Sequence, residues 1–580
     1  MNDSKFLMYF QNVHFKLIFE DKLEQFDNLK TNASRIQFLT AFCTDFQYDF
    51  VAELVKDLKS AEKLKIRGDK CLHEEINDQA VILYNEAIKI CPQDTSEGKE
   101  LYSNLIANRS EAFFNDGQHQ KYLQDVAFLQ KHGYQTKIIT NKLLEATQSQ
   151  SLLSLRQSEF KNTERSPKNV SYPALSNKLT IKHNNTMGRY VVASEDIKTG
   201  EILAVEHPYA SVIKRQSNCG HCGTSSDQIY ACDECQTIYC SLKCLEKAKI
   251  YHQYECAILL PLLDLVDFWL PLRMVTQRSL QQVINDTKLK KAEIYKTDDY
   301  YNVSQLVQHE HKRSPDVMLH KSLIVTFFVQ LLKKTGYFGC VNGNIGLSND
   351  EIFIGELLFL YIEISKCNSH AIYTMHDGND YKNCGVGLYP TVSLFNHSCD
   401  PSVEKYNVKN MIVVRSVKPI KTGDVVYDNY GPLYMYNTKT ARQDKMADDY
   451  QFTCVCQACV EDWPLLTDMN TKNLRVLCCC GGSILLNISE KMKNDLGLST
   501  CSKCQKKQNL EFMRGILLDL DKQVKKANKL FINGNYGKAQ LIYANIIDTQ
   551  LKYFAPPFVS LLTAQERLID CFRYNGNTKT

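Results

Sequence analysis

The sequence predicts a multidomain α+β protein, with β-rich segments and a cysteine-rich zinc-binding segment in the middle of the chain and helical segments at both ends. Three observations support this prediction. Cysteines at metal-ligand spacing crowd residues 219–256, a buried-strand pattern ends in a polar cluster at residues 396–401, and helical periodicity marks both ends of the chain. At 580 residues the chain is too long for one hydrophobic core, so several domains are expected.

Composition narrows the class of protein. The chain is 44% hydrophobic and 23% charged, as in soluble globular proteins, and its net charge of +4 does not favour nucleic-acid binding by the whole surface. Residues 1–15 lack a basic region followed by an apolar run, so no secretory signal is expected. The most apolar window, residues 257–272, is interrupted by Pro261, Asp264 and Asp267 and is not expected to cross a membrane.

The 23 cysteines are an odd number and mostly stand at short spacings. Without a secretory signal, such clusters indicate metal ligands in a reducing compartment, and not disulfides. A cytoplasmic and nuclear location is therefore expected.

The first part of the chain is predicted to be helical. Residues 1–60 show apolar residues at helical spacing, and from Ala61 the sequence resembles a 34-residue TPR template. The matching positions are Gly68, Ala80, Tyr84, Ala87 and Pro92 in the first unit, and Ala112 and Gly117 in a second unit. TPR pairs bind peptides, some through an Asn and Lys clamp on a carboxylate. Asn108 fits that clamp, but Asp69 would repel a carboxylate. Helices that brace the rest of the molecule are the alternative.

The strongest signal is a run of seven cysteines and one histidine. These residues are Cys219, Cys222, Cys232, Cys235, Cys240, Cys244, His252 and Cys256. Together they make two complete tetrahedral sites, which is how structural zinc is held. The Cys240–Cys244 and His252–Cys256 spacings put ligands one helical turn apart. Because no ligand position is left for water, this zinc is predicted to be structural and not catalytic.

Two further stretches have the residue pattern of β-strands that are followed by polar residues. Residues 179–213 alternate like short strands, with a hairpin turn at residues 198–200 in which Gly200 can take a positive φ. The second stretch, residues 385–401, reads GVGLYPTVSLFNHSCDP. Its first half has the pattern of a buried strand up to Phe395, and Pro401 stops the ladder. We expect this strand to deliver hydrogen-bonding groups to a site, although a strand followed by an ordinary Asx turn is the alternative.

The polar run Asn396-His397-Ser398-Cys399 resembles the NHSC motif of SET-domain lysine methyltransferases. The cysteine run of residues 219–256 resembles a MYND finger. Together with the TPR-like segment, these features make the chain similar to the SET and MYND domain-containing protein-lysine methyltransferases, in the subgroup with an N-terminal TPR segment. The MYND resemblance implies which ligands share an ion. The first set is Cys219, Cys222, Cys240 and Cys244, and the second is Cys232, Cys235, His252 and Cys256.

The resemblance divides the chain into segments and specifies the fold class as a split SET domain with a pseudoknot. The expected segments are N-terminal helices (1–60), TPR-like repeats (61–147), a linker (148–175), the first SET half (176–218), the MYND finger (219–256), a helical SET insertion (257–380), the second SET half (381–432), a post-SET zinc loop (433–463), a Cys-rich ribbon-like segment (464–512) and C-terminal TPR-like helices (513–580).

The resemblance implies S-adenosylmethionine as the cofactor. The residues expected to contact it are Asn185, Thr186, Met187, Gly188, Asn368, Asn396, His397, Tyr430 and Phe452. Tyr430, in the DNYGP stretch, is the expected catalytic tyrosine, with Tyr427 as its alternative. Phe452 is expected to lie against the adenine. The family often has two glycines where only Gly188 stands here, and an aromatic residue where His370 stands.

A second cysteine cluster is incomplete by itself. Cys454, Cys456 and Cys459 cannot close a tetrahedral zinc site, and in the family a cysteine at the position of Cys399 supplies the fourth ligand. Farther on, one more zinc site is expected at Cys478, Cys480, Cys501 and Cys504, although the run of three consecutive cysteines 478–480 leaves open which two of them bind.

Two functions from different classes follow. The first is transfer of a methyl group from S-adenosylmethionine to the lysine of a protein, histone or non-histone. The lysine amine must be neutral to react, although only about one part in a thousand is neutral near pH 7.4. The second is a scaffold that recruits peptide partners through its TPR and MYND surfaces, with a weak SET core. Residues 219–256 are not strongly basic, so direct nucleic-acid binding is not expected.

Overall fold

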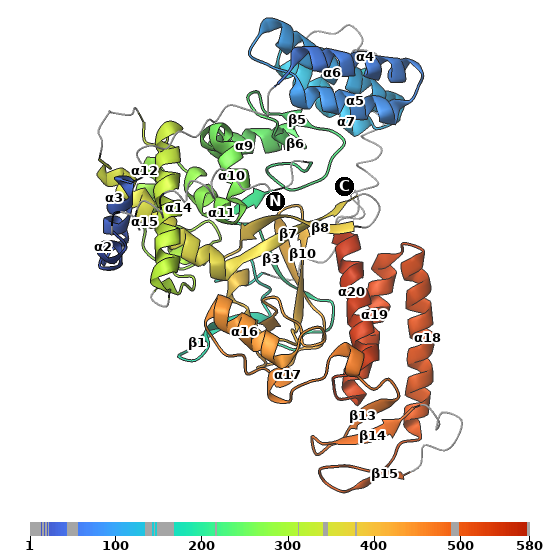
Figure 1. The fold of residues 1–580 in the computed structure, drawn as a ribbon. Helices are drawn as coiled ribbons and strands as arrows, with labels where there is room; N and C mark the ends of the chain where they lie inside the picture. The colour runs from blue at the N-terminus through green and yellow to red at the C-terminus, as the bar shows by residue number, and fades with distance from the viewer. Residues whose placement is uncertain are drawn as a thin grey trace. The chain divides into compact units, whose positions relative to one another are not determined.

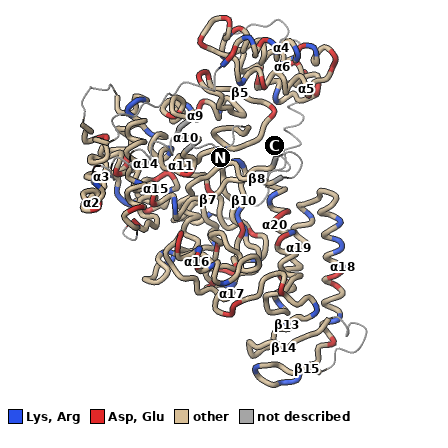
Figure 2. Tube along the Cα trace, viewed as in Figure 1, with Lys and Arg blue, Asp and Glu red and all other residues tan. Residues whose placement is uncertain are grey.

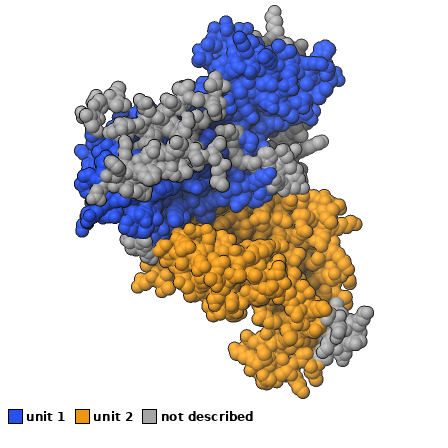
Figure 3. Space-filling model, viewed as in Figure 1, with its two compact units in different colours: residues 1–164, 209–290, 303–388 blue, residues 165–208, 291–302, 389–580 orange. Residues whose placement is uncertain are grey.

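A computed structural model of the chain describes residues 22–42, 56–133, 168–214, 217–310, 313–339, 346–376, 380–488 and 498–576, with a few positions at 13–20 and 142–147. The chain forms two compact units, coloured separately in Figure 3. Unit 1 holds residues 1–164, 209–290 and 303–388, and unit 2 holds residues 165–208, 291–302 and 389–580. Residues expected to form one SET domain are therefore divided between the two units.

Unit 1 is mainly helical (Figure 1). Its helices are α2 (Leu23–Asp27), α3 (Asn32–Thr40), α4 (Leu58–His73), α5 (Asn77–Ile90), α6 (Ser96–Asn115), α7 (His119–Lys131), α9 (Leu242–Glu255), α10 (Leu259–Asp264), α11 (Val266–Thr276), α12 (Leu280–Asp286), α14 (Pro315–Lys334) and α15 (Asn349–Asn368). Helix α13 (Tyr300–Ser304) crosses the boundary between the units. The strands β4 (Ala210–Ile213), β8 (Asp380–Leu388) and β7 (Ser369–His376) form one antiparallel sheet in that order.

Helices α4 to α7 pack as successive helical hairpins. Small residues allow the close approach: a Cβ on Gly68 would lie 2.6 Å from the Tyr84 ring, and Ala80 and Ala87 are fully buried. The carboxylate of Asp69 is occupied, because Asn108 Nδ2 donates to it at 2.7 Å and the Tyr84 hydroxyl at 2.9 Å. Asn108 is thus hydrogen-bonded within these helices, to the carboxylate that was expected to oppose a carboxylate clamp.

Helix α14 is long and apolar enough to cross a membrane by length and composition. However, 72% of its apolar window is buried inside the protein. Its buried side chains, among them Leu323, Phe327 and Leu331, pack against α3 and α15. This is the environment of a core helix.

Unit 2 joins short strands to a C-terminal helical array. Its strands are β1 (Leu179–Asn184), β2 (Gly188–Ala193), β3 (Ile202–Glu206), β9 (Asn396–His397), β10 (Val403–Val408), β11 (Met411–Ser416), β12 (Tyr427–Asp428), β13 (Asn473–Leu477), β14 (Ser483–Asn487), β15 (Leu498–Thr500) and β16 (Lys507–Asn509). Its helices are α16 (Lys439–Tyr450), α17 (Gln457–Val460), α18 (Phe512–Ile532), α19 (Tyr536–Tyr553) and α20 (Val559–Gly576), with 3-10 turns at Val392–Leu394 and Leu466–Asp468.

The strands of unit 2 make a hairpin β1–β2, a sheet of order β10-β11-β3 and a parallel pair β9–β12. One apolar core, which includes Leu179, Leu203, Tyr389 and Val426, lies beneath them. A second core joins β10 and β11 to helices α18 to α20. The parallel pair is the element that positions the candidate site.

Two expected boundaries differ from the structure. The strand of residues 385–395 ends at Leu388, and residues 392–394 form a 3-10 turn. Pro390 has no N–H for the ladder, and the Glu206 carboxylate instead accepts the N–H groups of Thr391 and Val392, both at 2.9 Å. The helical insertion ends at residue 368, since residues 369–376, rich in β-branched and aromatic side chains, form β7.

Residues 198–200 turn as expected, with Gly200 at φ +91°, but they do not join a hairpin. Strand β2 pairs with the preceding strand β1, whereas β3 pairs with β11, which comes from a distant part of the chain. The end of the expected linker is also structured. Leu175 is buried and bridges to Ala204, and Tyr172 packs against the same core of unit 2.

Candidate active site and metal centres

The finger of unit 1 gathers its eight ligands into two groups. The first is Cys219, Cys222, Cys240 and Cys244, and the second is Cys232, Cys235, His252 and Cys256, the two sets implied by the sequence. Within each group all ligand atoms lie within 4.8 Å of one another. Neighbouring sulfurs stand 3.5 to 3.7 Å apart, which is about the ~3.8 Å edge of a tetrahedron with 2.3 Å zinc–sulfur bonds.

Local structure explains these positions. The turn between β5 (Tyr230–Ala231) and β6 (Ile238–Tyr239) carries Cys232 and Cys235. The hairpin itself lies between the pairs Cys219–Cys222 and Cys240–Cys244. Helix α9 begins at a Ser241 cap, whose hydroxyl accepts the Cys244 N–H at 3.2 Å, and it carries Cys244 and His252. Since every position is filled by protein, the finger can hold metal for structure but cannot activate water.

A buried ionic network docks helices α6 and α7 onto the finger. Arg109 forms a bidentate pair with Asp125, at 2.7 and 3.0 Å, and both side chains are fully buried. Arg109 also donates to the Ile229 carbonyl of the finger at 2.7 Å, and Tyr230 donates to Asp125 at 2.9 Å. The neighbouring carboxylate raises the pKa of Arg109 and so opposes the effect of its burial. Helices α6 and α7 therefore brace the finger through this network.

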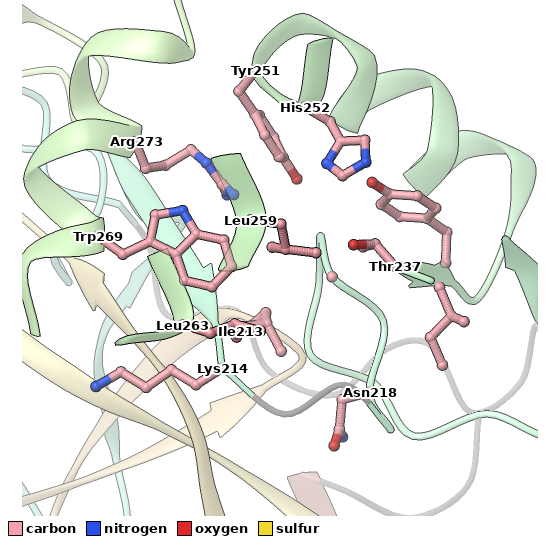
Figure 4. A pocket seen from close by; sticks show the side chains of 13 residues that line it. Ile213, Lys214, Asn218, Thr237, Tyr251, His252, Leu259, Leu263, Trp269 and Arg273 are labelled. Carbon is pink, nitrogen blue, oxygen red and sulfur yellow. The ribbon is translucent and has the colours of Figure 1, made fainter. Parts of the chain in front are cut away.

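The base of the finger is fixed in the same way by Arg273 of α11 (Figure 4). Its guanidinium donates to Glu255 at 2.6 and 2.7 Å and lies 3.5 Å from the centroid of the Tyr251 ring. The pocket beside it, lined by Trp269 and His252 among others, has a volume of about 30 Å³, room for about one water molecule. This pocket is a packing gap and no substrate site.

The expected cofactor residues in unit 2 begin at the β1–β2 turn. Asn184 Oδ1 accepts the N–H groups of Thr186 and Met187, and Gly188 follows at φ +64°. Asn185 and Thr186 are exposed. The Asn396 side chain donates to the Met187 carbonyl at 3.0 Å, across 209 residues of sequence. The structure thus brings the glycine turn and the NHSC run together.

The NHSC run is threaded against the stretch that carries the tyrosines. Tyr427 pairs with Asn396 and Asp428 with His397 in the parallel pair β9–β12. The Tyr430 N–H donates to His397 Nδ1 at 3.1 Å, so the ring proton is on Nε2, which lies 3.4 Å from Cys399 Sγ. Burial lowers the pKa of His397 to about 4, which agrees with a neutral ring. The neutral His397 ring therefore helps to hold the crossing together.

Tyr430 is held in this crossing. Its hydroxyl donates to the Phe395 carbonyl at 2.9 Å, and its ring centroid lies 5.3 Å from that of His397. The Tyr450 hydroxyl donates to the Tyr430 carbonyl at 3.2 Å. Tyr427 lies in β12 itself, and burial raises its pKa. The structure therefore puts both tyrosines beside the NHSC run. The hydroxyl of Tyr430 lies at the carbonyl of Phe395, the residue just before this run.

The post-SET loop meets Cys399 as the family resemblance implied. Cys399 Sγ lies 3.6 Å from Cys459 Sγ and 4.0 Å from Cys454 Sγ, and Cys456 completes a group within 4.8 Å. The buried Arg442 donates to Cys459 Sγ at 3.6 Å, and its positive charge favours thiolates there. This loop also carries Phe452, which is 37% exposed and lies 6.1 Å from the His397 ring.

Asn368 belongs to unit 1 and differs from the other expected cofactor residues. It ends α15, and its amide donates to the carbonyls of Val307 and Ile364, both at 2.8 Å. Asn368 therefore helps to close the end of its own helix. A contact with the cofactor remains a prediction for this residue.

One residue beside the site, Glu206, was not predicted from the sequence. Glu206 ends β3, is buried, and accepts from the N–H groups of Thr391 and Val392 and from the Thr297 hydroxyl at 2.7 Å. Burial raises the pKa of this carboxyl, and the three donors oppose that effect. Glu206 anchors the 3-10 turn that leads into the NHSC run. An acidic residue ending an apolar strand was the available signal.

Comparisons with known proteins agree with this geometry. A SET domain family model matches residues 188–431, from the glycine of the first turn to the residue after Tyr430. A SET and MYND domain-containing protein of Dictyostelium discoideum is 27% identical over 48% of this chain and 59% of its own length. Human protein-lysine N-methyltransferase SMYD4 is 24% identical over 81% of this chain and 75% of its own length.

Human N-lysine methyltransferase SMYD2 is 26% identical over 47% of this chain and 58% of its own length. The matched SET segment contains the threaded crossing, and the cysteine groups lie within and beside it. The chain is thus similar to SET-domain proteins and, among these, to SET and MYND domain-containing proteins.

Proposed function

We propose that the protein is a protein-lysine N-methyltransferase that uses S-adenosylmethionine. The observation that supports this most directly is the threaded crossing, because it joins the Gly188 turn, the NHSC run and Tyr430, which lie far apart in the sequence. The SET match and the relatives named as lysine methyltransferases support the same reaction.

The residues of unit 2 fit such a cofactor. The β1–β2 turn exposes Asn185 and Thr186, and no side chain crowds Gly188, so backbone groups are open to a ligand. Phe452 offers a partly exposed ring close to His397, suited to stacking on an adenine. When bound there, S-adenosylmethionine would supply the methyl group: the lysine nitrogen would bond to the methyl carbon, sulfur would keep the electrons of the broken bond, and the proton of the amine would pass to solvent.

Tyr430 would orient the lysine amine in this scheme. Its hydroxyl donates its proton to the Phe395 carbonyl, so its oxygen lone pairs remain to accept from the amine. An amine held in line with the leaving sulfur gains much of its rate from position alone.

Calorimetric titration of the purified, zinc-loaded chain with S-adenosylmethionine tests the proposal first. We expect micromolar binding, lost in N396A and H397A, followed by methyl transfer to lysine-containing protein substrates. K182A, an exposed position of β1, is the matched control and should bind normally. Absence of binding in the zinc-loaded wild type would contradict the enzyme and favour the scaffold.

Recruitment of peptide partners is the second candidate function, and one observation favours it. Helices α6 and α7 and the finger line an open cleft of about 830 Å³. Its walls include Tyr102 and Phe128 on one side and Asp233 and Lys249 on the other. A peptide with an apolar side chain between charged groups would fit this lining. Binding lost in F128A while S-adenosylmethionine affinity is kept would support the recruitment function.

A cytoplasmic and nuclear location, without a membrane and without direct nucleic-acid binding, completes the proposal. Basic and acidic residues are interspersed along the helices of each unit, which supports protein partners over a polyanion (Figure 2). Fractionation of cells expressing a tagged chain tests the location. Retention on DNA at physiological salt would contradict the exclusion of nucleic acid.

A further inference from the structure

Four cysteines outside the finger and the post-SET loop form another compact cluster in unit 2. Cys478 and Cys480 stand in the turn between β13 and β14, and Cys501 and Cys504 stand in the turn between β15 and β16. We propose that these four thiolates bind a structural zinc ion, a metal centre separate from those of the finger and from the one beneath the NHSC run.

The distances fit a metal and not disulfides. Cys478 Sγ lies 3.7 Å from Cys504 Sγ, and Cys480 Sγ lies 3.6 Å from Cys501 Sγ. All four sulfurs lie within 4.8 Å of one another. A disulfide would need about 2.05 Å, whereas the edge of a zinc–thiolate tetrahedron is about 3.8 Å. The spacing matches that in the finger.

The two turns are shaped around the sulfurs. Gly481 N–H donates to the Cys478 carbonyl at 2.9 Å, with Gly481 at φ +75°. A Cβ on Gly482 would lie 3.0 Å from Cys501 Sγ and 3.3 Å from Cys480 Sγ, so only glycine leaves the cluster its space. The Gln508 side chain donates to Cys478 Sγ at 3.1 Å, and the Lys503 N–H donates to Cys501 Sγ at 3.4 Å. Such N–H donors stabilise thiolates.

The structure also decides which of the three consecutive cysteines take part. Cys478 is buried and Cys480 partly buried, and both face the cluster, whereas Cys479 is exposed and lies outside it. Four protein sulfurs fill all positions of a tetrahedral ion, so the site has no place for water and is structural.

This centre would stabilise the base of the C-terminal helices. Cys478 and Cys501 belong to one buried core with Val476 and Ile484 of the first hairpin and Met513 of α18. Strand β13 also contacts the end of α19, where the Ala555 N–H donates to the Arg475 carbonyl at 2.8 Å. Loss of the ion would therefore loosen the two hairpins and the helix ends that they support.

Zinc content of the full chain, measured by mass spectrometry of the metal, tests the proposal. We expect C480S and C501S each to hold one zinc fewer than the wild type, and the matched control C479S to hold the wild-type number. An unchanged zinc content in C480S and C501S would overturn the proposal, and a loss in C479S would overturn the assignment of ligands.

A measurement on the wild type avoids dependence on variants that fold poorly. With N-ethylmaleimide, Cys479 should be alkylated quickly, while the other four cysteines of this segment react only after a chelator is added. Equal labelling of Cys480 and Cys479 in the zinc-loaded protein would also overturn the site. S-adenosylmethionine binding involves none of these residues, so failure here would leave the proposed methyltransferase untouched.

Discussion

The finger and the post-SET loop both gather cysteines, but they differ in how their ligands are spread along the chain. In the finger, the paired ligands Cys222 and Cys240 are 18 residues apart, and Cys232 and Cys256 are 24 apart. The post-SET cluster joins Cys399 to Cys459 across 60 residues. Loop closure over the longer span adds only about 1 kcal/mol of entropy, so length alone is no obstacle.

The difference lies in what must form first. The finger needs only its own hairpin and α9, whereas Cys399 reaches the loop only when β9 and β12 are paired. Metal binding in the finger is thus a local event, and metal binding at Cys399 depends on the same crossing that builds the candidate active site. The two kinds of centre should respond differently to mutation.

The largest effect is expected for C399S. This variant should lose one zinc and keep the two of the finger, and its S-adenosylmethionine affinity should fall by at least about 10-fold, because the loop that carries Phe452 loses its anchor. Metal analysis and calorimetry measure both. C244S is the counterpart, losing finger zinc but keeping the affinity for the cofactor. Unchanged zinc content in C399S would contradict the proposed difference between the finger and the metal centre at Cys399.

Y430F should lower the rate of methyl transfer by about 100-fold, a typical cost of removing one positioned polar group at a reacting centre. Fold, zinc content and S-adenosylmethionine affinity should stay near those of the wild type, because the backbone N–H bonded to His397 remains. Y427F is the matched control. Normal turnover in Y430F, or loss of turnover only in Y427F, would transfer the role to Tyr427.

R109A tests whether the buried Arg109–Asp125 pair supports the finger. Removing one partner of this fully buried pair should cost about 3 kcal/mol locally, because Asp125 keeps an unpaired charge. Amide hydrogen exchange in α6 and β5 should then quicken by about 100-fold. K131A, which removes the exposed pair Lys131–Glu246, should cost less than about 1 kcal/mol. Equal effects would show that the helices do not brace the finger through Arg109.

The smallest effect is expected for E206Q. A glutamine has one acceptor oxygen where the carboxylate has two, so one backbone N–H of Thr391 or Val392 loses its partner, at a cost of about 1 to 3 kcal/mol. Affinity for S-adenosylmethionine should fall severalfold while zinc content is kept. T297A removes only the hydroxyl donor and should have a weaker effect. An affinity loss in T297A as large as in E206Q would indicate that the carboxylate bonds to the turn are unimportant.

Much of the candidate site could be predicted because its motifs are compact. The spacing of Cys219 to Cys256 defines its own zinc sites, and the NHSC run identifies a family whose other members indicate Tyr430 and Cys399. The strand boundaries around residues 388–395 could not be predicted in this way. They depend on Glu206, which lies 185 residues from Thr391, and no local pattern carries a contact of that range.

The sequence by itself determined that the finger holds two complete sets of zinc ligands in closely spaced pairs, and the family resemblance implied which pairs share an ion. Only the tertiary structure decided that β9 threads against β12, that Glu206 holds the turn before the NHSC run, and that Cys479 lies outside the last cluster. Those outcomes depend on buried contacts between segments distant along the chain, and the free energy of such contacts is fixed only by the packing around them.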